Sequence, residues 1–376
     1  MDVMNNHEEK QQKVKRILEG SFLKPYMEDK DVTDIKWNGT FLRIENRATG
    51  RHIPKSQPTS EEVNNLMRQI AAIQGEELTE SEPILDTAFG DLRVNTIHPV
   101  CAYGGTFALR VSKPHLAITK LTDLVSEDIS VLLELLIKAR GNFTISGGTG
   151  TGKTELQKLL VGFMDDYDSI FLIEDTPDSH IKELYPNKDI SSLRTLANKD
   201  REKKVDIWEL IKAGLRNNPD WIMISETRGK EAAGVLDSAK TDHSIITTVH
   251  AKSARAIPGR YIPMMKQAPA YANSDDVTIL RDIIEMLPYG IQMRKEHDDG
   301  EVIRDIKEVV EFIDYSSDKG LIYRTIYQKE NEWYPDLGEY KTIEKIQPVS
   351  ERTIKLLKDA KLYHLLPDVF KEEVAK

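Results

Sequence analysis

The segment SGGTGTGKTELQ, residues 146–157, constrains the fold more than any other part of the chain. Its glycines, lysine and threonine have the spacing of a phosphate-binding loop, in which glycines let successive backbone N–H groups point at phosphate oxygens. Such a loop requires a strand before it and a helix after it. The apolar run NFTIS (142–146) predicts the strand, and leucines at helical spacing after the loop predict the helix.

The same region alternates expected strands with expected helices. Further short apolar runs occur at 169–173, 221–225 and 244–249, and a helical pattern covers 206–218. This alternation predicts a mainly parallel sheet covered by helices on both faces. An extra strand between the strand of the phosphate loop and the strand that ends before Glu226 is typical of RecA-like P-loop ATPases. The predicted fold class is therefore α/β, with a RecA-like P-loop ATPase domain.

The length of 376 residues predicts more than one core. Residues 1–29 are expected to form a helical extension, with a surface helix over 7–24. A smaller α+β N-terminal domain is expected at 30–115, where a hairpin, a capped helix and two more strands are indicated. The ATPase domain is expected at 116–315, followed by a charged, Tyr-rich C-terminal appendage at 316–376.

Composition narrows the classes of protein. The formal net charge of −10 argues against strong direct binding of nucleic acid through bulk positive charge. The single cysteine, Cys101, excludes a disulfide framework and a cysteine zinc cluster within the chain. The beginning of the chain lacks the apolar core of a signal peptide, and no apolar run is long enough to span a bilayer. We therefore expect a cytoplasmic protein.

The phosphate loop predicts a nucleotide site. Lys153 is expected to contact the β- and γ-phosphates of ATP, and Thr154 to offer a hydroxyl to Mg²⁺. The expected nucleotide-binding residues are Gly147, Gly148, Thr149, Gly150, Thr151, Gly152, Lys153, Thr154 and Glu155.

Acidic residues follow two of the expected strands. Glu226 comes directly after WIMIS, and Glu174 and Asp175 follow the run at 169–173. The carboxyl ends of parallel strands meet at one edge of a sheet, so we expect these carboxylates near the phosphates. There a carboxylate can hold Mg²⁺ or orient the attacking water. Glu226 is the first choice for the catalytic residue and Glu174 the second. The expected Mg²⁺ site comprises Thr154, Glu174, Asp175 and Glu226.

Two histidines, His243 and His250, flank the strand expected at 244–249. Along an extended segment they are too far apart to bind one metal ion together. Because the strand is expected to neighbour the nucleotide, both are candidates for polar sensors of the γ-phosphate.

Several segments together resemble the secretion-superfamily ATPases. IEDTPD, LRNNPDWIMISETRGKEA and TDHSIITTVHAKSARAIPGR follow GGTGTGKT in this order and resemble the aspartate box, Walker B motif and histidine box of that family. The resemblance covers roughly residues 30–315. Members of the family power type IV secretion and conjugation, type II secretion, and type IV or Tad pili.

The resemblance implies a homohexameric ATPase that works with membrane-embedded secretion or pilus machinery at the inner face of the plasma membrane. It also implies that Arg93 and Arg110 of the N-terminal domain reach the phosphates, where a guanidinium would spread charge over the transferred group. Arg216 and Arg228 match family positions as well. Ser225 and Asp242 stand where the family usually has glycine, and Asp242 places a carboxylate beside His243.

Alternatives remain open at this stage. The four-cysteine metal site of many type II and pilus-extension ATPases cannot form with one cysteine, and the compact N-terminal domain resembles the conjugation and Tad-pilus branches more closely. A P-loop kinase or a nucleic-acid-stimulated motor would also carry the phosphate loop, as would a nucleotide-gated assembly scaffold with little turnover.

Overall fold

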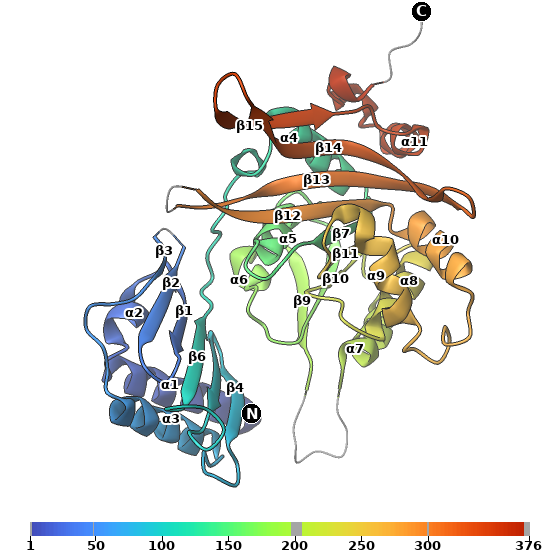
Figure 1. The fold of residues 1–376 in the computed structure, drawn as a ribbon. Coiled ribbons are helices and arrows are strands. Elements are labelled where there is room, and N and C mark those ends of the chain that lie inside the picture. Colours follow the sequence, from blue (N-terminus) through green and yellow to red (C-terminus); the bar gives the residue numbers. More distant parts are fainter. Residues whose placement is uncertain (1, 48, 197–204, 299–300, 372–376) are drawn as a thin grey trace, which may run out of the picture. The chain divides into compact units, whose positions relative to one another are not determined.

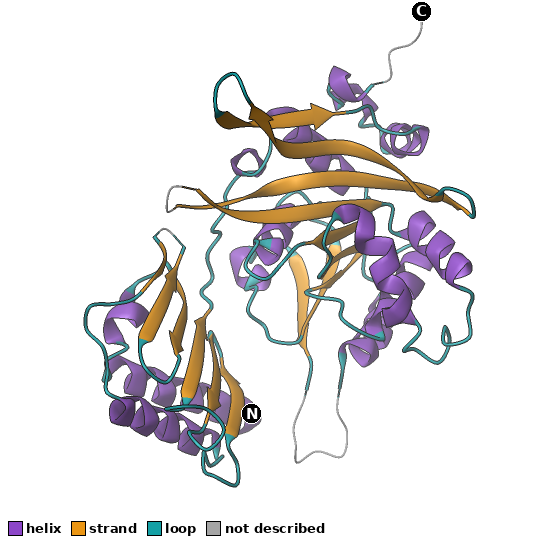
Figure 2. Cartoon of the chain, viewed as in Figure 1, coloured by secondary structure: helices purple, strands orange, loops and turns teal. Residues whose placement is uncertain are grey.

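The computed structural model describes residues 2–47, 49–196, 205–298 and 301–371. These residues form two compact units (Figures 1 and 2). The first consists mainly of the chain up to His115, and the second mainly of the chain from Leu116 onward. The four-part division of the chain stays a prediction.

The first unit is a six-stranded antiparallel sheet in the order β3-β2-β1-β6-β5-β4. Buried and accessible residues alternate along its strands, and the buried face packs against the first and third helices. Its elements are α1 (Asp2–Glu19), α2 (Lys24–Glu28), β1 (Val32–Trp37), β2 (Leu42–Asn46), β3 (Gly50–His52), α3 (Ser60–Gln74), β4 (Ile84–Phe89), β5 (Leu92–Ile97) and β6 (Thr106–Val111).

Local sequence signals account for much of this unit. The predicted hairpin is confirmed, with Gly39 at a φ of +92° between β1 and β2. The predicted capped helix is confirmed as α3, where Thr59 and Glu62 form a capping box. The helix expected over 7–24 is confirmed as α1, except that it ends at Glu19; two of its apolar residues, Val14 and Leu18, are fully buried against the sheet.

The second unit is a nine-stranded mixed sheet in the order β15-β14-β13-β12-β7-β11-β10-β8-β9. The strands from β12 to β9 pair in parallel, whereas β13, β14 and β15 pair antiparallel. The elements are α4 (Glu127–Lys138), β7 (Phe143–Ser146), α5 (Lys153–Val161), β8 (Ser169–Glu174), α6 (Ile181–Leu184), β9 (Asp189–Arg194), α7 (Ile207–Gly214), β10 (Trp221–Ile224), α8 (Glu231–Lys240), β11 (Ser244–Val249), α9 (Ile257–Met265), α10 (Asp276–Met286), β12 (Tyr289–Asp298), β13 (Glu301–Ser316), β14 (Gly320–Tyr334), β15 (Glu339–Ile346) and α11 (Glu351–Asp359).

Helices cover both faces of the parallel part of this sheet. One apolar cluster joins the sheet to α4, α5 and the C-terminal segment, and a second joins it to α7, α8, α9 and α10. β11 lies between β7 and β10, which is the extra strand expected between the phosphate loop and Glu226. The structure thus confirms the predicted fold class, including the smaller α+β unit at the N-terminal end.

The described part of 316–376 continues the same sheet through β14 and β15 (Figure 1). Beyond them, α11 is tied to β13 by the carboxylate of Glu311, which is fully buried. This carboxylate accepts hydrogen bonds from the Ser350 hydroxyl at 2.5 Å and the Thr353 hydroxyl at 2.9 Å, and pairs with Arg352. Because a buried carboxylate needs such partners, these contacts fix the position of the C-terminal helix.

Candidate nucleotide-binding site

The phosphate loop links β7 to α5, as its sequence predicts. Gly147, Gly150 and Gly152 all have positive φ values, of 154°, 76° and 97°. A Cβ atom at Gly147 would lie 2.6 Å from the Thr151 hydroxyl and 2.8 Å from the Met293 carbonyl oxygen, so this position has no room for a side chain. The glycine spacing in the sequence therefore reflects both backbone conformation and crowding.

Lys153 begins α5, and its amine lies over the loop. Its Nζ donates hydrogen bonds to the carbonyl oxygens of Gly147 and Gly148, at 2.9 and 3.1 Å. Burial lowers the pKa of Lys153; the nearby carboxylate of Glu226 partly opposes this shift, and Arg228 adds to it. An anion bound at the loop would favour the ammonium form of Lys153 and so oppose this lowering of its pKa.

The ends of several strands meet at the edge of the sheet that carries the loop. Ser146, the last residue of β7, pairs with Val249, so His250 follows β11 at the same edge. Glu226 follows β10 at this edge too. Gln157 of α5 donates a hydrogen bond of 3.1 Å to the carbonyl of Ile224, which ties the helix after the loop to the strand before Glu226.

Glu226 is the centre of a charged network. Its carboxylate lies 2.9 Å from an Arg228 nitrogen and 3.2 Å from Nε2 of His250, and Arg228 also lies 3.5 Å from Asp175. Burial would raise the pKa of Glu226, but the hydrogen bond and charge of Arg228, with smaller contributions from His250 and Lys153, hold it below the usual value. At neutral pH Glu226 is therefore an anion beside the loop lysine.

Glu174 is the last residue of β8, and it is almost completely buried. Its carboxylate accepts a hydrogen bond of 3.2 Å from the backbone N–H of Ser179, in the loop that follows the strand. Glu174 therefore contacts the loop that follows its own strand, whereas Glu226 contacts the side chains of Arg228, after β10, and His250, after β11.

The structure separates His243 from this network. His243 precedes β11 and His250 follows it, so the two histidines lie at opposite edges of the sheet. Nδ1 of His243 lies 3.1 Å from the Thr241 hydroxyl. The expectation that both histidines neighbour the nucleotide is corrected for this one, because a six-residue strand carries it away from the loop. Arg216, which precedes β10, lies at the same distant edge.

The two residues that replace family glycines differ in backbone conformation. Asp242 has a φ of +68°, in the left-handed region that glycine adopts easily and aspartate tolerates better than most residues. Ser225 is held in the sheet instead: its N–H donates to the Ile173 carbonyl at 3.0 Å, and its carbonyl accepts from the Thr248 hydroxyl at 2.7 Å. Asp242 therefore keeps the backbone conformation that a glycine at this position would adopt.

Arg93 and Arg110 face each other across β5 and β6 of the first unit. Both side chains are about half exposed, and each lies near one acid: Arg93 is 3.5 Å from Asp86, and Arg110 is 3.3 Å from Asp34. They form a pair of cations on the open face of the sheet. Their contact with the phosphates stays a prediction.

Residues from β12 and β13 also approach the loop, and the sequence analysis did not name them. Arg304 donates a hydrogen bond of 2.9 Å from Nε to the Gly150 carbonyl. Gln292 accepts one of 2.5 Å from the hydroxyl of Ser146, directly before the loop. These positions are more than 130 residues away along the chain. In the sequence both stand in a highly charged segment, and neither belongs to a motif that marks a nucleotide site.

The residues at this edge fit a Mg²⁺ ion held together with phosphate oxygens. Mg²⁺ in nucleotide sites takes one or two protein ligands, substrate phosphates and several waters. Thr154 lies in the first turn of α5, and Glu226 supplies an ionised carboxylate at the same edge. Among the described residues, no three His, Cys, Asp or Glu side chains form a metal cluster, so a cage built by the protein alone is not seen there.

Comparison with curated proteins supports this reading of the motifs. The chain is 33% identical over 271 residues to an uncharacterized protein of Bacillus anthracis, covering 70% of this chain and 59% of that protein. It is 22% identical to the type IV secretion system protein VirB11 of Bartonella quintana, covering 72% of this chain and 86% of that protein. The chain spans about half to two thirds of the length of the Bacillus anthracis protein and of two further curated relatives.

Solved structures show the same fold. The ATPase DotB of Yersinia pseudotuberculosis superposes with a TM-score of 0.55 at 16% identity, covering 77% of this chain and 76% of that chain. The pilus retraction motor PilT with bound ADP superposes with a TM-score of 0.53 at 18% identity, covering 93% and 88%.

In the part of the chain that the structure describes, no helix combines the length and apolar character needed to cross a bilayer. The sequence profile of the family described as "Type II/IV secretion system protein" matches residues 79–289, more than half of the chain, and this stretch contains the phosphate loop and the strand-end residues Glu174, Glu226 and His250. The chain therefore belongs to the type II/IV secretion system protein family.

Proposed function

We propose that this protein is an ATPase that couples ATP hydrolysis to macromolecular transport or assembly in a type IV secretion, conjugation or pilus system. The observation that carries the proposal is the position of Glu226. Its ionised carboxylate follows the strand two places from β7, contacts His250 at 3.2 Å and interacts electrostatically with Lys153 of the phosphate loop. A phosphate loop beside an ionised strand-end carboxylate is the arrangement that nucleotide hydrolysis requires.

Each residue at the edge would have a distinct role. The amides of the loop and the Lys153 amine would bind the phosphates. Thr154 and a carboxylate would hold Mg²⁺, which supplies charge neutralisation for the phosphoryl group. Glu226 would orient or deprotonate the attacking water, because its pKa is held low enough to keep it ionised.

Glu174 and His250 would support this centre. Glu174 is buried at the end of β8 and would either share the task of Glu226 or act on a water of the metal ion. His250 is about half exposed and already contacts Glu226, so a γ-phosphate could change that contact when it binds. His250 would thereby report on the state of the nucleotide.

We further propose that the active form is a homohexameric ring that works with membrane-embedded secretion or pilus components at the inner face of the plasma membrane. In such a ring Arg93 and Arg110 would contact phosphates. Their side-by-side position on β5 and β6 supports this proposal, since two adjacent guanidinium groups suit a multiply charged anion. The family match and the VirB11 relative support an assignment to secretion systems, and the PilT structure shows that a pilus motor shares this fold.

Turnover by purified variants tests the proposal. Lys153→Ala and Glu226→Gln should each lower the rate of ATP hydrolysis by roughly two orders of magnitude or more, with circular dichroism spectra unchanged. Glu285→Gln is the matched control: Glu285 is exposed on α10, and the same change there should leave turnover unaltered. Near-normal hydrolysis by Glu226→Gln would refute the role of this residue. Absence of hydrolysis by the parent protein in ring form would favour an assembly scaffold instead.

A further inference from the structure

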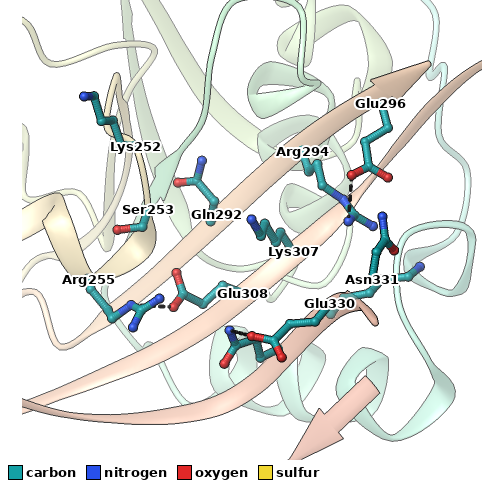
Figure 3. A pocket seen from close by; sticks show the side chains of 12 residues that line it. Lys252, Ser253, Arg255, Gln292, Arg294, Glu296, Lys307, Glu308, Glu330 and Asn331 are labelled. Atoms are coloured by element: carbon teal, nitrogen blue, oxygen red, sulfur yellow. Dashed lines mark hydrogen bonds and ion pairs between the residues drawn. The ribbon is translucent and has the colours of Figure 1, made fainter. Parts of the chain in front are cut away.

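A cavity of about 440 Å³ lies in the second unit, on β12, β13 and β14 (Figure 3). Its remaining wall is the segment 252–255, which is separated from His250 by one residue. The volume is within the range of small-ligand sites in proteins. This cavity is distinct from the phosphate loop, although β12 pairs with the strand that precedes the loop.

The cavity carries unbalanced positive charge. Five basic and three acidic side chains line it. All three acids are already paired with cations: Glu296 lies 3.0 Å from Arg294, Glu308 lies 3.0 Å from Arg255, and Glu330 lies 2.8 Å from Lys345. Each acidic side chain of the lining therefore already has a cationic partner within ion-pair distance.

Two of the five basic side chains that line the cavity make no ion pair with the described residues, whereas the other three are paired. Arg294 and Lys329 also bind the buried Asp305, at 2.6 and 3.0 Å. By contrast, Lys252 and Lys307 make no ion pair with any residue that the structure describes, although Lys307 attracts Glu330 over a longer distance. In Figure 3 Lys307 lies near the middle of the cavity and Lys252 at its rim. Both side chains are exposed, and in a protein of net charge −10 they give this cavity a local excess of positive charge.

Buried polar groups form the floor of the cavity. Gln292 and Glu308 are 8% and 3% exposed. Glu308 accepts a hydrogen bond of 2.9 Å from the backbone N–H of Ala254 and pairs with Arg255, so the floor is bonded to the segment that follows His250. The amide of Gln292 lies beside Lys307 in Figure 3, where it adds a neutral polar group to the cationic wall.

We propose that this cavity binds a small phosphorylated anion, with Lys307 as its main anchor and Lys252 closing the rim. The limited volume favours a small molecule over a folded partner, and the two spare positive charges favour a multiply charged group. Lysine is well suited to this task, because its ammonium group binds phosphate as a compact point charge from several directions.

The position of the cavity implies a regulatory role, and this step rests on the proposed function. An anion that draws Lys252 inward would move the segment 252–255, which Glu308 holds at Ala254. Only Ala251 separates that segment from His250, whose ring contacts Glu226 at 3.2 Å. Occupancy of the cavity would therefore change the contact between His250 and Glu226, and with it the rate of hydrolysis.

Calorimetric titration with inorganic pyrophosphate tests the site. The protein is first saturated with ADP, which occupies the phosphate loop, and EDTA is present throughout. Pyrophosphate should then bind saturably, with about tenfold or greater loss of affinity in Lys307→Gln, since a hydrogen bond to a charged group is lost. Lys355→Gln, an exposed lysine on α11, is the matched control and should bind as the parent does. Absence of binding, or equal affinity in the parent and Lys307→Gln, would overturn the proposal.

The two proposals fail in different ways. If ADP does not bind in the first stage, the proposed function is contradicted, while the dependence of pyrophosphate binding on Lys307 still decides whether the cavity is a site. For the regulatory step, pyrophosphate at saturating ATP should change turnover in the parent and not in Lys307→Gln. An identical response of both proteins would refute the coupling to His250.

Discussion

Replacing Arg228 with glutamine tests how the ionisation of Glu226 is controlled. Arg228 donates a hydrogen bond of 2.9 Å to the Glu226 carboxylate, and without it burial would raise the pKa of that carboxyl group. In Arg228→Gln the pKa of Glu226 should therefore rise. The acid limb of the pH profile for ATP hydrolysis should move upward with it, since Glu226 must be ionised to act on water.

The magnitude follows from the contact and its exposure. A hydrogen bond to a charged group contributes about 1.5–3 kcal/mol when it is protected from solvent. Arg228 is 59% exposed, so solvent screening should reduce the contribution to roughly 1 kcal/mol. One pKa unit corresponds to about 1.4 kcal/mol, so the midpoint of the acid limb should move upward by about half a unit to one unit.

The assay is the pH dependence of kcat/KM between about pH 4 and 8. Arg260→Gln is the matched control, because Arg260 is exposed on α9 and makes no ion pair with the described residues. The same linkage applies to stability. Because the folded pKa of Glu226 is depressed, its contribution is present above the unfolded pKa and is lost as the pH falls through the folded pKa. An acid limb with the same midpoint in the parent and Arg228→Gln would refute the reasoning.

Three further predictions concern single side chains. Gly147→Ala should destabilise the fold by about 2 kcal/mol or more, because its Cβ would lie 2.6 Å from the Thr151 hydroxyl; an unchanged urea midpoint would contradict this. Glu311→Gln should lower the thermal midpoint, since a buried charge that pairs with Arg352 is lost, at a cost of about 3 kcal/mol, while Glu285→Gln should not. His250→Gln should reduce ATP turnover several-fold and His243→Gln should not; equal losses would show that the edge of the sheet does not decide the role.

Some of the fold could be predicted because its signals are local. Thr59 and Glu62 have the spacing of a capping box, and the structure contains that box. The apolar runs before Glu174 and Glu226 are strands buried on both faces, which makes them continuous in the sequence. The strands β12 to β15 were not predicted. β14 and β15 pair antiparallel, are largely accessible to solvent and carry many charged residues, so they resemble polar segments in the sequence.

The sequence by itself determined the phosphate loop, because glycine spacing directly encodes the backbone conformation that Gly147, Gly150 and Gly152 adopt. Tertiary structure alone decided which other residues lie beside the loop, at the same edge of the sheet. Strand direction places His250 beside Glu226 and carries His243 to the opposite edge, and pairing across more than 130 residues brings Arg304 to the loop. Such contacts depend on sheet order and register, which are set by packing over the whole chain and leave no local pattern in the sequence.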